Sequence, residues 1–231
     1  MSVYVIAEAG VNHNGSLALA KDLVRVASEC GADAVKFQTF VTEKLVTQHA
    51  KKAEYQKEND ASSSTQAEML KRLELSYEDF AELNEECKKY NIDFITTCFD
   101  SESLDIICRT TAPKVLKVGS GDLTNLPFLI EHARKGANVI ISTGMATLSE
   151  VEDALAALAF GYLTESGTQP ENYRWLKHNY FTAEAIEHIK GKVTILHCVT
   201  DYPAQPQDLN LDAIRQLREA YKLHVGYSDH A

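Results

Sequence analysis

The sequence has 231 residues, 45% of them hydrophobic, which is enough to bury the core of one α/β domain. Its formal net charge is -10, from 33 acidic and 23 basic residues, and no basic cluster is present that would bind a phosphate backbone, so no nucleic-acid partner is expected. The five cysteines form no CxxC pair, which argues against a disulfide framework and a zinc knuckle.

The N-terminus shows no signal-peptide pattern, and no apolar run reaches the about 20 residues that a membrane helix needs. From these features we expect a cytoplasmic protein with no membrane partner.

Short apolar segments alternate with amphipathic segments of helical length along the chain. Strands are predicted at 4–9, 34–40, 93–99, 115–121, 138–143, 193–198 and 224–228. Helices are predicted after Ser16, Ser76 and Ser101, over 127–135, from near Ser149 and over 210–222. This alternation predicts right-handed βαβ units and a parallel sheet. Seven strands fit either a (β/α)8 barrel without its last strand or an open doubly wound sheet.

Two long connections interrupt the alternation. Residues 41–75 are charged and serine-rich and follow the second predicted strand, so in a barrel they would form a lid or substrate loop on the catalytic face. Residues 161–191 precede the sixth strand and would lie on the opposite face, where we expect a role in packing or assembly.

Polar residues stand at the end of every predicted strand. In chain order they are Glu8; Lys36 and Gln38; Thr96 and Thr97; Lys117, Ser120 and Asp122; Ser142 and Thr143; His197, Thr200 and Tyr202; and Ser228, Asp229 and His230. Parallel α/β folds build their sites at the carboxyl ends of their strands. One such residue could be a satisfied polar group of the core, but the recurrence in seven strands predicts a functional site.

Lys36 and Lys117 are the most informative pair, because each lies within an apolar strand and a buried ammonium is costly unless an anion neutralises it. One interpretation is an internal salt bridge, with Glu8 or Asp122 as the partner. The other is a site for a dianion, with donors from a further set of residues, namely Thr97, Ser120, Ser142 and Ser228. A lysine that forms a Schiff base is a third possibility.

Two histidines have open roles. His230 follows Asp229 at a strand end and could be a metal ligand, although a single histidine is weak evidence for a metal site. His13 could act in catalysis or could shape the first loop.

Eight motifs occur in the order found in bacterial sialic-acid synthases. They are AEAGVNHNGS, VKFQT, AEYQ, ITTCFD, LKVGSGDLTNLP, ISTGM, HCVTDYPA and GYSDH, and they span essentially the whole chain. The chain therefore resembles this family, whose branches make neuraminic, legionaminic or pseudaminic acids or spore-coat sugars.

The resemblance implies a (β/α)8 barrel and a reaction that joins phosphoenolpyruvate to the aldehyde of an N-acetylhexosamine and releases phosphate. It implies a divalent metal, Mn²⁺ or Mg²⁺, with His230 as one ligand. Position by position it assigns the phosphoenolpyruvate ligands as Lys36, Thr97, Lys117, Ser120, Ser142 and Ser228. The residues that would face the sugar are Glu8, Gln38, Asp122, Thr200 and Tyr202. Of the carboxylates we expect Asp122 to be the acid/base group, with Glu8 second.

The sequence also departs from the family pattern. Asp122 and Thr200 stand where some members have Glu and Asn, and Cys98 replaces a common proline. In the family that the chain resembles, a small antifreeze-like domain follows the barrel. We expect residues 1–231 to be a truncated barrel that ends before the eighth strand and lacks that domain, and we expect the full-length protein to be a homodimer. Two alternatives are another aldolase on the same barrel, dependent on phosphoenolpyruvate or on a Schiff base, and a barrel that binds ligands without turnover.

Overall fold

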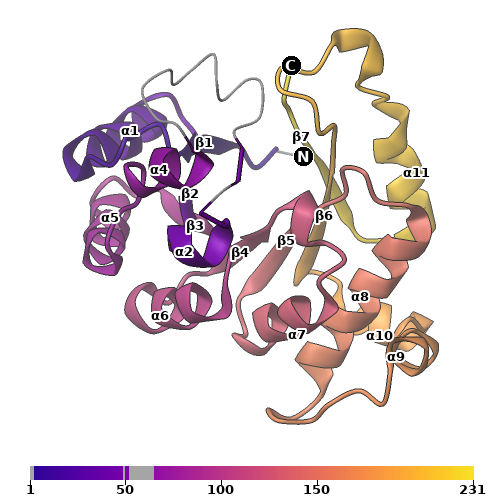
Figure 1. Ribbon diagram of the computed structural model, residues 1–231. Coiled ribbons are helices and arrows are strands. Elements are labelled where there is room, and N and C mark those ends of the chain that lie inside the picture. Colours follow the sequence, from indigo (N-terminus) through magenta and orange to yellow (C-terminus); the bar gives the residue numbers. More distant parts are fainter. Residues whose placement is uncertain (1–2, 49, 52–64) are drawn as a thin grey trace. The chain divides into compact units, whose positions relative to one another are not determined.

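The structure is a computed structural model that describes residues 3–48, 50–51 and 65–231 (Figure 1). The chain divides into two compact units, Met1–Lys114 and Val115–Ala231, which we call the N-terminal and the C-terminal unit. Each unit alternates parallel strands with helices, as the sequence predicts.

The N-terminal unit contains a three-stranded parallel sheet. Its strands β1 (Ile6–Gly10), β2 (Ala34–Thr39) and β3 (Asp93–Cys98) pair in chain order. The helices α1 (Leu17–Glu29), α5 (Tyr77–Lys89) and α6 (Ser101–Thr111) lie beside this sheet in Figure 1, and α5 contacts both α1 and α6. Two short helices, α2 (Thr42–Leu45) and α4 (Gln66–Lys71), belong to the long 41–75 connection. The AEYQ motif of that connection lies outside the described residues, and the lid role of the connection stays a prediction.

The helices of the N-terminal unit begin at residues whose side chains satisfy free backbone N–H groups. Ser16 caps α1, and Ser76 forms a capping box with Asp79 at the start of α5. Asp100 caps α6, so that the helix begins one residue earlier than a Ser101 cap would allow. These caps explain why the predicted starting points of α1 and α5 are accurate and that of α6 is one residue late.

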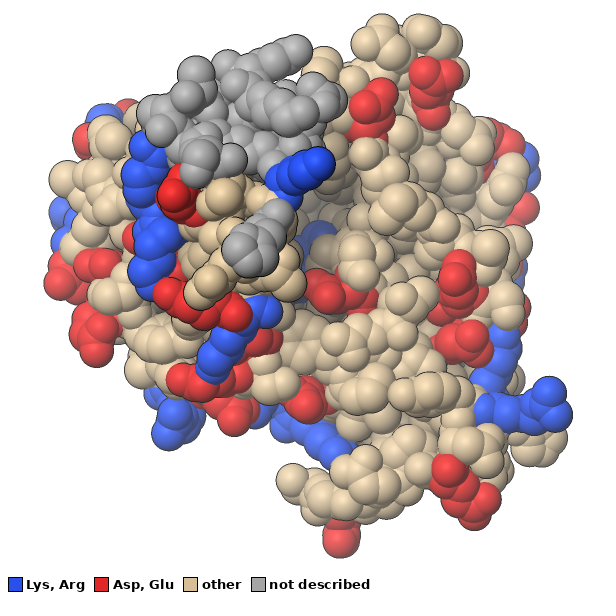
Figure 2. All heavy atoms as spheres, viewed as in Figure 1, with Lys and Arg blue, Asp and Glu red and all other residues tan. Residues whose placement is uncertain are grey.

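Charged side chains on the helical surface of the N-terminal unit pair with one another, and Figure 2 shows blue and red residues interspersed on the face it draws. Lys71 lies 3.0 Å from a carboxylate oxygen of Glu43 and 2.9 Å from one of Glu74, and Lys21 lies 2.6 Å from one of Glu82. Exposed pairs of this kind each contribute only about 0–1 kcal/mol. They set the surface charge pattern more than the stability.

The C-terminal unit contains four parallel strands that pair in chain order. They are β4 (Val115–Val118), β5 (Asn138–Ser142), β6 (Val193–Cys198) and β7 (His224–Ser228). Its helices are α7 (Leu126–Arg134), α8 (Leu148–Leu163), α9 (Tyr173–Tyr180), α10 (Ala183–Ile189) and α11 (Asp212–Tyr221). The sequence predicts that the β4 strand reaches residue 121, but it ends at Val118 because Ser120–Asp122 folds into a 3-10 turn.

Helix α8 is buried around nearly its whole circumference. Its eight consecutive residues from Ala154 to Gly161 are all buried, and α7, α9 and α10 all contact the helix. The rings of Trp175 and Tyr180, both from α9, lie 6.2 Å and 4.9 Å from the ring of Phe160. The 161–191 connection therefore has the packing role predicted for it, since its two helices cover α8.

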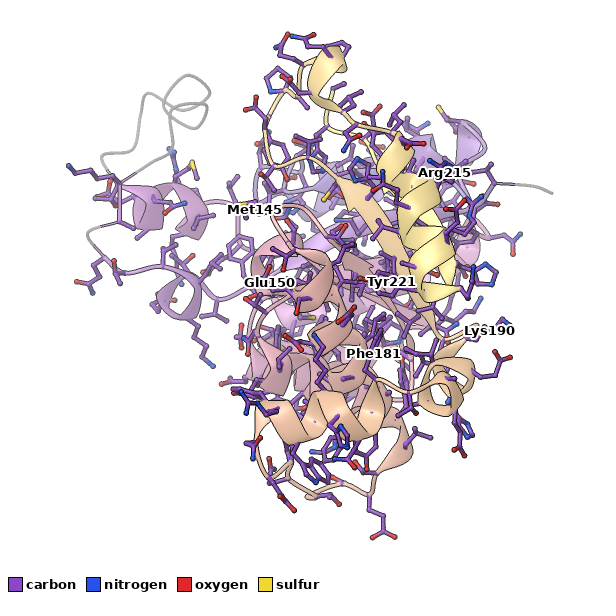
Figure 3. The ribbon with its side chains drawn as sticks, turned by 90° about the vertical axis from the view of Figure 1, so that its right-hand side faces the viewer. Met145, Glu150, Phe181, Lys190, Arg215 and Tyr221 are labelled. Carbon is purple, nitrogen blue, oxygen red and sulfur yellow. The ribbon has the colours of Figure 1, made fainter. Side chains whose placement is uncertain are left out.

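Tyr221, in the last turn of helix α11, packs against other parts of the C-terminal unit. Figure 3 shows it near Phe181. The two rings lie 6.2 Å apart in an edge-to-face arrangement, and the Tyr221 hydroxyl donates a hydrogen bond of 2.9 Å to the backbone carbonyl of Leu148. This contact places the start of α8 beside the end of α11.

None of the helices within the described residues is both long and apolar enough to cross a bilayer.

Candidate active site

Side chains alternate between the two faces of each strand, and this separates core residues from candidate site residues. In β2, Val35 and Phe37 are fully buried, whereas Lys36 and Gln38 on the other face are only partly buried. In the C-terminal unit, Ile141 and Ile195 pack with helical residues in one apolar cluster. We call the face of each sheet opposite to its helices the inner face.

In the N-terminal unit, Glu8 and Lys36 are direct neighbours on the inner face, because they are paired in the parallel register of β1 and β2. Their charged groups lie 2.5 Å apart, and their side chains are 52% and 14% exposed, respectively. The internal salt bridge considered for Lys36 is therefore present, and Glu8 is its partner.

Two further residues that the sequence predicts for the site stand on the inner face of this unit, two positions further along the strands than Lys36. Gln38 and Thr97 are paired in register on β2 and β3. Thr96 points to the opposite face, where its hydroxyl shares a 2.8 Å hydrogen bond with the Thr39 hydroxyl. Thr96 is thus a satisfied core residue, and four of the predicted site residues (Glu8, Lys36, Gln38 and Thr97) gather on one face.

In the C-terminal unit, Lys117 on β4 and Ser142 on β5 meet on the inner face. The Lys117 ammonium donates hydrogen bonds of 2.7 Å to the Ser142 hydroxyl and 2.9 Å to the backbone carbonyl of Val118. Both side chains are buried, with residue exposures of 6% and 4%. The ammonium is therefore held close to the end of its strand.

Asp122 stands at the end of the 3-10 turn that follows β4. Its side chain is half-buried, and this burial raises the pKa of the carboxyl group above its usual value. The carboxylate has no hydrogen-bond or ion-pair partner among the described residues. A carboxyl group with a raised pKa and an open hydrogen-bonding capacity is suited to proton transfer.

Gly144 lies close to residues from three other parts of the C-terminal unit. A Cβ atom added there would lie 2.7 Å from the Thr200 methyl group, 3.0 Å from the Cys198 sulfur and 3.3 Å from the Ser120 hydroxyl. Only glycine allows this approach. Ser120 and Thr200, both predicted site residues, are thus brought together around it.

Cys198 and Gly10 are not among the residues that the sequence predicts for the site, whereas Gly144 belongs to the Thr143-Gly144 pair whose backbone is expected to allow close approach of a phosphate. The alternation rule could have placed Cys198 on the inner face, since it lies opposite to His197. His197 itself is anchored structurally, because its Nε2 hydrogen-bonds the Leu209 carbonyl at 2.7 Å. No signal in the sequence identifies the approach of Gly10 to the Gln38 amide, because Gln38 belongs to another strand.

The end of β7 carries Ser228 and His230. The Nδ1–H of His230 donates to the backbone carbonyl of Val199, and its Nε2 lies 3.2 Å from the Ser228 hydroxyl. The ring stacks on Tyr202 at 4.4 Å between centroids. Ser228, Tyr202 and His230 therefore form one small cluster, at the β6 and β7 ends of the inner face.

The arrangement of His230 fits one metal ligand, because a ligating histidine commonly donates its other ring N–H to a carbonyl. The described residues contain no group of three His, Cys, Asp or Glu side chains that could hold a metal ion. A metal ion at His230 would therefore need ligands beyond the protein side chains that this part of the chain brings together.

His13 is fully buried, and burial lowers its pKa. Its Nδ1 accepts a 3.1 Å hydrogen bond from the backbone N–H of Gly15. Of the two roles considered for His13, these contacts support the shaping of the first loop.

The chain is similar to known proteins along its length. It matches the NeuB family over residues 23–231, and so it belongs to that family. It is 45% identical to the N,N'-diacetyllegionaminic acid synthase of Legionella pneumophila and 42% identical to that of Campylobacter jejuni. The alignments cover 100% and 98% of this chain but only 58% and 60% of the relatives, so the chain spans about three fifths of their length.

Solved structures support the same assignment. The N-acetylneuraminic acid synthetase of Leptospira borgpetersenii, solved with citrate, superimposes with a TM-score of 0.75 at 29% identity, over 100% of this chain and 66% of that one. The spore coat polysaccharide biosynthesis protein SpsE of Bacillus subtilis gives 0.71 at 29% identity, over 99% of this chain and 53% of that one. The predicted fold class, the α/β barrel of the sialic-acid synthases, is thereby confirmed.

Proposed function

We propose that this chain carries the phosphoenolpyruvate-binding part of a nonulosonate synthase. The proposed reaction joins phosphoenolpyruvate to the open-chain aldehyde of an N-acetylated amino sugar. The observation that carries the proposal is the lysine on the inner face of each sheet, Lys36 and Lys117, in a chain that belongs to the NeuB family.

The phosphate and carboxylate of phosphoenolpyruvate would be bound by cations and short hydroxyl side chains. The proposed ligands are Lys36, Thr97, Lys117, Ser120, Ser142 and Ser228. Support comes from the Lys117–Ser142 hydrogen bond, since a buried ammonium next to a hydroxyl gives two donors that need no rearrangement to meet an anion. Fixing both ends of the molecule would hold its enol carbon toward the aldehyde.

The sugar would be bound by Gln38, Thr200 and Tyr202, with Glu8 and Asp122 nearby. The Legionella and Campylobacter relatives are named for N,N'-diacetyllegionaminic acid, so an amino sugar with two acetylated amines is the first substrate to test. N-Acetylmannosamine is the second, because the Leptospira structure is named an N-acetylneuraminic acid synthetase.

Asp122 would move the proton during the addition of water and the loss of phosphate. Its raised pKa supports this role, because an acid/base group works best when its pKa lies near the working pH. We also propose that a divalent metal, Mn²⁺ or Mg²⁺, is required and that His230 is one ligand, and that the full-length protein is a homodimer.

The test is the release of inorganic phosphate from phosphoenolpyruvate with Mn²⁺ and each amino sugar in turn. We expect release that depends on the sugar, together with a nine-carbon acid detected by mass spectrometry. No release with any sugar, although phosphoenolpyruvate binds, would favour a barrel that binds ligands without turnover. A borohydride-trapped adduct on Lys117 would instead indicate a Schiff-base aldolase.

A further inference from the structure

The Glu8–Lys36 ion pair differs from the surface ion pairs of the N-terminal unit. It lies on the inner face of the sheet, and its lysine side chain is only 14% exposed, whereas the Lys21 and Lys71 side chains are 34% and 56% exposed. Its carboxylate is nevertheless 52% exposed. The lysine is thus confined within the sheet, while its partner is in contact with solvent.

The backbone of β1 is shaped to hold the Glu8 carboxylate in this position. The register of β1 against β2 shifts between Glu8 and Gly10, as at a β-bulge, and Gly10 has a φ of +53°. A Cβ atom at Gly10 would lie 3.1 Å from Oε1 of Glu8 and 3.6 Å from Nε2 of Gln38. The bulge therefore packs the carboxylate, which is paired with Lys36, against the bare backbone of Gly10, and the Gln38 amide lies close to the same glycine.

We propose that Glu8 is an internal counter-ion, which keeps Lys36 neutralised in the ligand-free protein and which an anionic group of the substrate replaces. This inference rests on the proposed function, because it takes phosphoenolpyruvate as the anion. A largely buried ammonium is stabilised by a neighbouring anion, and a half-exposed Glu side chain can return to water at a small cost. Substrate binding thus exchanges one anion for another at Lys36.

The exchange would couple the binding of phosphoenolpyruvate at Lys36 to the binding of the sugar near Glu8 and Gln38. A displaced Glu8 carboxylate would stay in the neighbourhood of the Gln38 amide, because both side chains lie close to Gly10. It is then able to accept hydrogen bonds from a sugar hydroxyl. Glu8 therefore becomes available to the second substrate only after the first has bound to Lys36.

The proposal predicts that removing the counter-ion strengthens binding of the anion. Substituting Glu8→Gln keeps the shape of the side chain and removes the charge that competes for Lys36. We expect phosphoenolpyruvate to bind about three- to tenfold more tightly, which is the range that a partly exposed ion pair of about 1 kcal/mol would give. Inorganic phosphate should show the same direction of change.

The measurement is isothermal titration calorimetry with phosphoenolpyruvate at constant ionic strength, on four variants besides the unmodified chain. Glu82→Gln is the matched control, because Glu82 is 57% exposed and also pairs with a lysine, so it removes the same charge away from the inner face. Lys36→Gln and the double variant Glu8→Gln/Lys36→Gln complete a double-mutant cycle. Circular dichroism establishes that each variant is folded.

We expect Glu8→Gln to tighten binding, Glu82→Gln to leave it unchanged, and the effect of Glu8→Gln to vanish when Lys36 is replaced. Unchanged or weaker binding by Glu8→Gln would overturn the counter-ion role, and so would equal tightening in the absence of Lys36. If the unmodified chain and every variant fail to bind phosphoenolpyruvate, the proposed function itself is wrong and the inference falls with it.

Discussion

Each unit carries a lysine on the inner face of its own sheet and one of the two candidate carboxylates, but the units hold these groups differently. In the N-terminal unit, Glu8 and Lys36 lie 2.5 Å apart as an ion pair. In the C-terminal unit, Lys117 hydrogen-bonds to the Ser142 hydroxyl and to a backbone carbonyl. Asp122 stands apart, half-buried and with a raised pKa.

This difference shows how two similar lysines can respond differently to their surroundings. The position of Lys36 depends on a side chain that can rotate away, whereas the position of Lys117 depends on the sheet itself. The N-terminal unit is therefore suited to replacing one anion by another at Lys36. The C-terminal unit is suited to holding the Lys117 ammonium in one position. Substitutions in the C-terminal unit test that contrast.

The largest expected effect concerns Asp122. Replacing Asp122 with Asn keeps the shape and removes the group that we propose transfers the proton, so we expect the turnover number to fall about 10²- to 10⁴-fold with little change in phosphoenolpyruvate affinity. The raised pKa means that the ionised form is lost as pH falls through that value, so the activity of the unmodified chain should decline on the acid side. Steady-state phosphate release across pH measures both effects, and an unaltered turnover number would contradict the assignment.

Lys117→Met should weaken the binding of phosphoenolpyruvate without lowering the stability of the fold. A charge-assisted hydrogen bond contributes up to about 3 kcal/mol, so we expect affinity for phosphoenolpyruvate to fall on the order of 100-fold. Replacing a buried ammonium with an apolar chain of similar length has little cost in stability. Calorimetry and thermal unfolding measure the two quantities, and normal binding by the variant would refute the phosphate-site assignment.

His132 should make the stability of the C-terminal unit depend on pH, independently of the pH dependence of activity expected from Asp122. It is fully buried in α7, and burial lowers its pKa from the ordinary value of 6.5 to about 4. Between these two pH values the unfolded chain binds a proton that the folded chain rejects, so stability is lost as pH falls from 6.5 toward 4. We expect a loss of about 2–3 kcal/mol across that window.

The His132→Leu variant should lack this part of the pH dependence. Urea unfolding at several pH values provides the comparison, with the stability of each protein at neutral pH as its own reference. An identical acid slope in both proteins would show that His132 does not titrate on unfolding.

The smallest expected effect is on stability and concerns Gly144, where chain segments of the C-terminal unit pack closely. Gly144→Ala places a methyl group 2.7 Å from the Thr200 methyl and 3.0 Å from the Cys198 sulfur. We expect a destabilisation of about 1–3 kcal/mol, which is typical of overpacking.

Gly121→Ala is the matched control, because a Cβ there meets no atom within 4 Å and its backbone is not left-handed. Thermal unfolding of both variants decides the question. Equal stability of the two variants would mean that the residues around Gly144 can move to accommodate a methyl group at no cost.

The sequence predicts most of the fold because strand alternation and helix caps are local signals. Ser16 and Ser76 cap the helices that are expected to follow them. The early end of β4 is not predicted, because the turn at Ser120–Asp122 depends on backbone hydrogen bonds that composition does not reveal.

The site is predictable in part. Strand-end polarity identifies Lys36 and Lys117, and the register then decides between the two carboxylates considered as the partner of Lys36. The contact of Gly144 with Cys198 is not predicted, because it joins residues that are 54 positions apart in the chain. Such a contact follows from packing between strands and leaves no local pattern.

The burial of α8 limits how far this protein can be shortened. Its outer side is covered by the two small helices of the 161–191 connection, which contribute Leu176 and Ile189 to the buried cluster. A deletion that joined α8 directly to β6 would expose a stripe of alanine, leucine and phenylalanine to water. Such a stripe would promote aggregation, so a minimal version of the C-terminal unit has to retain this connection.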